Sequence, residues 1–167
     1  MWAWKIFGLI LLPIALQTSV FHHFNFLGVV PNLVLVITIC YGLLQGTFEG
    51  LSLGLIGGLC LDLASGGILG INIMILGLLG LGAGYLAKMV FKGNLFVPII
   101  SIFAGTIISE FLSYSVLRAF GWRIEFFSLL FSSMFPLCFY HLLLTGPVYI
   151  GLLKVLSYYR QRVKVGA

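Results

Sequence analysis

The chain has 167 residues, of which 61% are hydrophobic and 8% are charged, whereas an ordinary soluble domain has about 25% charged residues. This composition predicts an all-α integral membrane protein whose single transmembrane domain covers residues 1–167. No extended polar region separates the hydrophobic runs, so we expect no soluble catalytic or nucleic-acid-binding domain, and the formal net charge of +5 comes from basic residues that stand mostly at the ends of those runs.

The first hydrophobic run extends from about Trp2 to Val20, which is long enough to cross a bilayer core that needs about 20 helical residues. We interpret it as a membrane span and not as a cleaved signal peptide, because no convincing cleavage site follows it. His22 and His23 come next, among phenylalanines and without an acidic or cysteine neighbour. We interpret them as a solvated pair at the membrane interface and not as a metal or pH-sensing site.

The second and third runs are short and close together. Pro31 and Asn32 open the second run, which extends from Leu33 to Leu44, and proline is well tolerated where a helix begins. A small polar break from Gln45 to Glu49 separates it from the third run, Gly50 to about Ala64. We expect these runs to form a tight helical hairpin, and the sequence leaves open whether one of its helices is re-entrant.

Glycine recurs every four residues from the polar break through the third run, at Gly46, Gly50, Gly54 and Gly58. Residues four apart lie on one face of a helix, so these glycines form a groove without side chains, which Gly57 widens. In membranes, such small-residue faces are a main route to helix association. The pattern predicts close packing against another helix of this chain or against a partner.

The fourth run, Ile68 to Ala87, carries a second small-residue face. Its glycines, Gly77, Gly80 and Gly84, are spaced by three and four residues. Lys88 and Lys92 close the run. We therefore predict the same role, helix packing or partner binding, for this face.

Two carboxylates stand within hydrophobic runs, where a charge costs about 2.5–3.5 kcal/mol at mid-membrane. Asp62 follows the glycine series, and two interpretations of it can hold together. With Ser65 it could cap backbone N–H groups where the chain turns at Gly66–Gly67, or it could make a polar contact with another protein or a substrate. Glu110 lies deep in the fifth run, Leu95 to Leu117, and is a functional candidate.

The last run extends from about Phe126 to Leu156 and contains Pro136 and Gly146–Pro147. No polar turn divides it, so we predict one kinked span with an interfacial extension. His141, within this span, is interpreted as a structural histidine. The segment from Tyr158 to Lys164 is an aromatic anchor followed by a basic cluster, which is typical of a cytoplasmic interface.

Charge favours about six transmembrane helices with both termini in the cytoplasm. On that topology, only Arg118 and Arg123 lie outside. The seven basic residues inside are Lys5, Lys88, Lys92, Lys154, Arg160, Arg162 and Lys164. This excess agrees with the tendency of cytoplasmic loops to carry Lys and Arg.

The sequence contains no nucleophile motif, phosphate-binding loop, HExxH motif or paired-carboxylate arrangement, so no enzymatic activity, cofactor or metal is expected. Cys40, Cys60 and Cys138 fall in separate hydrophobic runs and are interpreted as small buried apolar residues. A channel would need a polar pore, which these runs do not supply.

Several segments resemble the bacterial rod shape-determining MreD family. The resemblance extends over the whole chain in length and span count, and its motif covers roughly residues 31–90. The segments that carry it are Pro31-Asn32-Leu33, the Gln45-Gly46 turn, the run from Gly50 to Asp62 and Gly70-Ile71-Asn72. The chain departs from the family pattern at Asn32, where many relatives have Asp, and near Gln45, where a basic residue is frequent.

The resemblance implies a non-catalytic, multi-pass component of the bacterial inner membrane that acts in cell elongation and peptidoglycan synthesis. It implies binding to the membrane helix of an MreC-like scaffold protein, and action with MreB-like actin and a RodA-type glycosyltransferase with its class B penicillin-binding transpeptidase. Membrane lipid is a further expected partner, and nucleic acid is not. The mechanistic hypothesis is that the two glycine faces dock the partner's span.

The family fold is also similar to the six-helix substrate-binding subunits of energy-coupling-factor transporters. The alternative function is therefore a small-molecule binding subunit of a membrane transporter. Such a subunit needs several convergent polar groups, and Asn72, Glu110 and His141 are the candidates.

Overall fold

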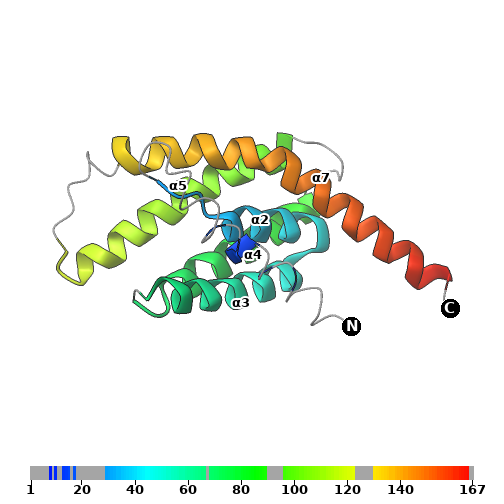
Figure 1. Cartoon of the computed structure of the whole chain (residues 1–167), viewed down its shortest axis with the longest axis horizontal. Helices are drawn as coiled ribbons and strands as arrows, with labels where there is room; N and C mark the ends of the chain where they lie inside the picture. The colour runs from blue at the N-terminus through cyan, green and yellow to red at the C-terminus, as the bar shows by residue number, and fades with distance from the viewer. Residues whose placement is uncertain are drawn as a thin grey trace.

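The computed structural model describes residues 8, 10, 13–15, 17, 29–66, 68–89, 96–122 and 130–165. Every regular element among these residues is helical (Figure 1). The elements are α2 (Leu33–Gln45), α3 (Thr47–Ser65), α4 (Ile71–Met89), α5 (Phe96–Ala119), the π-helix η2 (Leu130–Met134) and α7 (Phe135–Val165). Most of the predicted first span, with His22 and His23, lies outside the described residues.

Four segments are long and apolar enough to cross a membrane, and they are α3, α4, α5 and Phe131–Ser157. This confirms the predicted class, an all-α membrane protein. The helix α2 is apolar but has 13 residues, so it rises about 20 Å and cannot cross a core of about 30 Å by itself.

The helix α2 lies at the centre of the bundle, and nearly all of its residues are buried. Asn32 caps its N-terminus, because the Leu35 N–H donates to Asn32 Oδ1 at 3.1 Å. At the other end only Gly46, with φ of +119°, separates α2 from α3. The third helix therefore begins at Thr47 and not at Gly50 as predicted, since glycine turns the chain within one residue where other residues would be strained.

The helices α3 and α4 pack backbone against backbone in an antiparallel register. A Cβ atom added to Gly50 would collide with the carbonyl of Gly80, one added to Gly54 with the carbonyl of Leu76, and one added to Gly58 would lie 2.5 Å from the carbonyl oxygen of Asn72. The same register brings Gly84 against Gly46 and Thr47. As the position on α3 rises by four, the position on α4 falls by four.

The remaining predicted glycines also face neighbours within the chain. A Cβ at Gly57 would lie 2.7 Å from Cγ1 of Val34 on α2, and a Cβ at Gly77 would lie 2.9 Å from Cδ2 of Leu55 on α3. The glycine faces of α3 and α4 are thus filled from within the molecule. They leave no room for a partner's span, and the docking hypothesis needs a different surface.

The last run forms one continuous helix after a short π-helical segment. The helix α7 passes through Pro147 without ending, in agreement with the prediction of a single span. With 31 residues it rises about 46 Å, more than one crossing requires. Figure 1 shows its C-terminal part continuing beyond the other helices.

Replacement of Gly54 with Ala should destabilise the α3–α4 hairpin. The added methyl group would meet the Leu76 carbonyl and lie 2.9 Å from the Gly77 nitrogen, and overpacking of this kind costs about 1–3 kcal/mol. Thermal unfolding in detergent, followed by circular dichroism, should show a lower Tm. Gly151→Ala on α7 is the control, because a Cβ there meets nothing within 4 Å. An equal Tm for the two variants would contradict the packing described.

Candidate functional site

Asp62 lies in the last turns of α3, where its side chain caps the next helix. The residue is 2% exposed. Its Oδ2 atom accepts the Gly70 N–H at 2.8 Å and the Ile73 N–H at 3.3 Å. Its Oδ1 atom accepts the backbone and side-chain N–H groups of Asn72 at 3.2 and 2.9 Å.

These bonds satisfy N–H groups that the first turn of α4 cannot pair within the helix. The positive end of the α4 dipole also favours the carboxylate at this place. Ser65 contributes differently from the prediction, because its hydroxyl donates to the Asp62 backbone oxygen at 3.3 Å. Of the two interpretations, the structure therefore places Asp62 as a cap, with donors farther along the chain than Gly66–Gly67.

His141 joins three helices through both nitrogens of its ring. Its Nε2 accepts the backbone N–H of Asn32 at 2.9 Å, so Nε2 carries no proton. Its Nδ1 lies 2.8 Å from Thr106 Oγ1, and that hydroxyl donates to the Ile102 carbonyl at 2.8 Å. Nδ1 is therefore the donor to Thr106, and the neutral imidazole has both ring nitrogens hydrogen-bonded.

Glu110 lies half-buried on α5 near Cys138 of α7. Within the described part of the chain it makes no hydrogen bond or ion pair. Of the three polar candidates, Asn72 is hydrogen-bonded to Asp62, and His141 is hydrogen-bonded to Asn32 and Thr106. These two side chains are therefore already paired within the chain.

The described residues contain no group of three or more His, Cys, Asp or Glu side chains that could hold a metal ion. Of the three cysteines, Cys40 and Cys138 are buried, Cys60 is partly buried, and all are free thiols.

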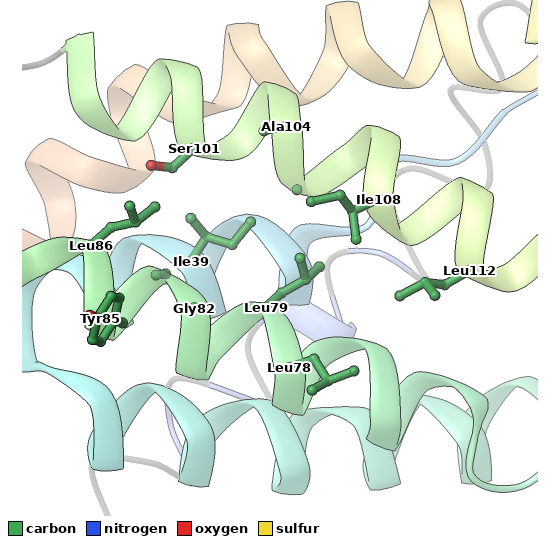
Figure 2. Close-up of a pocket in the computed structure, with 12 residues that line it drawn as sticks. Ile39, Leu78, Leu79, Gly82, Tyr85, Leu86, Ser101, Ala104, Ile108 and Leu112 are labelled. Atoms are coloured by element: carbon green, nitrogen blue, oxygen red, sulfur yellow. The ribbon is translucent and has the colours of Figure 1, made fainter.

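A groove opens between α4 and α5, and Ile39 of the buried helix α2 forms its floor (Figure 2). Its volume is about 420 Å³. The walls are almost entirely apolar. They consist of Leu78, Leu79, Gly82, Ala83, Tyr85 and Leu86 on α4, and Ser101, Ala104, Gly105, Ile108 and Leu112 on α5.

Gly82 is the residue in this groove that internal packing does not explain. A Cβ atom there would meet nothing within 4 Å, whereas Gly77, Gly80 and Gly84 on the same helix all face close neighbours. Glycine in a helix interior is less favourable than alanine by about 0.8–1.0 kcal/mol. Gly82 forms a notch between Leu78 and Leu86, which stand one turn away on each side.

The sequence pattern does not predict this groove. Gly82 falls outside the series formed by Gly77, Gly80 and Gly84, and that difference in spacing is the only signal that the sequence offers. Gly105, on the opposing wall, packs against another residue of this chain, because a Cβ there would collide with Ile39 Cδ1.

The sequence matches the family described as rod shape-determining protein MreD over residues 1–159. No curated protein and no solved structure matches the chain.

The two intramembrane carboxylates provide a matched pair of amide substitutions. Asp62→Asn places an N–H₂ group against backbone donors of α4 and should lower stability by about 1.5–3 kcal/mol, the range for hydrogen bonds to charged groups. Glu110→Gln alters a side chain that makes no hydrogen bond within the described residues and should change stability by less than about 0.5 kcal/mol. Thermal melting of both variants in the same detergent tests this difference. Equal losses of stability would show that Asp62 is not the cap of α4.

Proposed function

The chain belongs to the MreD family of rod shape-determining proteins, and we propose that it is a non-catalytic scaffold that docks the membrane helix of a partner protein. Membership of the family gives this membrane protein a role in cell shape. The observation that supports docking is the open α4–α5 groove with its unfilled notch at Gly82.

Helices associate in membranes through close packing, since apolar side chains gain little by leaving lipid for protein. Small residues on both walls of the groove, Gly82 and Ala83 on α4 and Ala104 on α5, allow a third backbone to approach. The groove offers two side-chain hydroxyls, on Tyr85 and Ser101, which is few for the specific recognition of a metabolite. It therefore suits an apolar helix better than a polar small molecule.

The proposed partner is an MreC-like protein with a single membrane helix. Through it the protein would act with MreB-like actin and with a RodA-type glycosyltransferase and its class B penicillin-binding transpeptidase, in the bacterial inner membrane. We place both termini in the cytoplasm, on the distribution of Lys and Arg. The protein would hold the synthesis complex together without catalysing a reaction.

Gly82→Leu should weaken recovery of the partner by at least about fivefold. A leucine there would fill the notch, and the overpacking cost of about 1–3 kcal/mol corresponds to a factor of 5 or more in an equilibrium constant. The protein should remain inserted and equally stable, because the position is open within the chain. Affinity purification of the tagged protein from native membranes, with quantitation of co-purified proteins, measures the effect.

Gly151→Leu on α7 is the matched control, since that glycine, which is exposed, is also helical and without a close neighbour. If Gly82→Leu and Gly151→Leu recover the partner equally well, docking in this groove is refuted. Co-purification of an ATPase module with a bound metabolite would instead support the transporter alternative.

A further inference from the structure

We propose that Glu110 is the centre of a second docking surface on α5, which binds a membrane helix of another protein that carries a lysine or arginine at mid-membrane. This surface lies on the opposite side of α5 from the α4–α5 groove. The inference goes beyond the proposed function, because it gives the protein two separate faces on which two membrane helices can be bound at once.

Helical geometry separates Glu110 from the groove. Ile108 and Leu112 line the groove, and each stands two residues from Glu110, which separates them from it by about 160° around the helix axis. Glu110 instead lies on the α7 side of α5, near Cys138. A helix bound at Glu110 would therefore leave the groove open.

The α7 side of this surface is aromatic and exposed. Phe135 stands three residues before Cys138, on a neighbouring position of the helix surface. Its ring stacks on that of Phe131, with the centroids 6.1 Å apart, and both side chains are about two-thirds exposed, at 68% and 66%. Together with Glu110 and Ser113 on α5, these residues form what we call the Glu110 face.

Glu110 stands near the middle of its span. The helix α5 has 24 residues, Phe96–Ala119, so Glu110 lies within one turn of its midpoint. A carboxylate at this depth is costly unless it is paired or reached by water. Glu110 is partly buried, and within the described part of the chain it makes no hydrogen bond or ion pair.

Ser113, one turn after Glu110, has the same property. The hydroxyls of Thr106, Ser109 and Ser115 on α5 each donate to a carbonyl of their own helix, as hydroxyls in helices commonly do. Ser113 makes no such bond among the described residues and is partly exposed. Two neighbouring polar side chains thus keep hydrogen-bonding capacity at the surface.

The described helices offer no cation at this level. On α5 the nearest basic residue is Arg118, eight residues later and about 12 Å along the axis. On α7 the first basic residue is Lys154, which follows Cys138 by 16 residues. His141 is closer, but both of its ring nitrogens are already hydrogen-bonded.

Charge complementarity therefore favours a cation from another protein. A lysine or arginine in a membrane helix carries the same cost as the carboxylate, and such groups pair with one another. The exposed phenylalanine rings add a surface on which a cation can be placed favourably. A symmetric contact with a second copy of this chain fits poorly, because it would bring two Glu110 carboxylates together.

The first test uses a synthetic single-span helix of leucine and alanine with one central lysine and a dansyl label at its N-terminus. The full-length protein is reconstituted with this peptide in phosphatidylcholine vesicles, and energy transfer from the protein's tryptophans measures binding. We expect the lysine peptide to bind at least about fivefold more tightly than the same peptide with leucine at its centre, since a desolvated charge pair contributes at least this much.

Variants of the protein identify the group that the lysine meets. Glu110→Gln should abolish the preference for the lysine peptide, and Glu110→Lys should transfer the preference to a peptide with a central glutamate. Ser113→Ala should reduce the preference by a smaller factor. Gly82→Leu is the control and should leave it unchanged, because Gly82 lies in the groove on the other side of α5. Equal binding of the lysine and leucine peptides, or a preference that survives in Glu110→Gln, would overturn the inference.

The second test identifies the occupant in native membranes. Photocrosslinking from p-benzoylphenylalanine in place of Phe135 should give a product with a different protein, joined in a membrane helix within one turn of a lysine or arginine. Glu110→Gln should lower the yield of this product. A crosslink to a second copy of the chain, to a helix without a basic residue, or to lipid alone would overturn the inference.

The two docking surfaces are tested separately. Loss of partner recovery in Gly82→Leu, without selectivity for the lysine peptide, would support groove docking and reject the Glu110 face. Selectivity that depends on Glu110, together with partner recovery that does not depend on Gly82, would support the Glu110 face and reject groove docking.

Discussion

Close contact between the backbones of α3 and α4 is the constraint on which the arrangement of the other helices depends. The contact is possible because each pair of residues at which the two backbones meet contains at least one glycine. Where α4 has Leu76 or Asn72, the glycine is on α3. Gly42 extends the same packing to α2, since a Cβ there would lie 2.8 Å from the Gly80 carbonyl oxygen. Three helices meet at Gly80, and α2, although too short to span the membrane, is buried among them.

Polar groups within the membrane are then used to hold this arrangement. A buried polar group is costly in hydrocarbon unless it is paired, and Asp62 and His141 are both paired with backbone groups. Asp62 fixes the end of α4 relative to α3, and His141 fixes the start of α2 relative to α5 and α7. Asp62 and His141 thus stabilise the helix packing, and the open apolar groove between α4 and α5 is the main candidate for a binding site.

Local periodicity made part of this structure predictable. Helical spacing places Gly46, Gly50, Gly54 and Gly58 on one face, and a carboxylate one step beyond them predicts a cap. The identity of the opposing helix was not predictable, because a glycine face fits any backbone. The bond from Asn32 to His141 joins positions 109 residues apart, and no local pattern encodes it. The notch at Gly82 was almost as hidden, since its spacing sets it apart from Gly77, Gly80 and Gly84 but only the three-dimensional surroundings show that it is unfilled.

In a membrane, docking of a helix exchanges one apolar occupant for another. The affinity of the proposed partner for the α4–α5 groove would therefore depend on how much better its side chains fill the notch at Gly82 than a flexible acyl chain of the surrounding lipid does. A rigid groove wall favours a partner helix over a lipid acyl chain. A helix whose side chains already match the notch packs closely, whereas a flexible acyl chain loses conformational entropy when it adopts the same shape. The glycine packing behind α4 provides such a wall. For the proposed docking, the interface between α3 and α4, although closed to partners, would thus set the selectivity of the surface on the opposite side of α4.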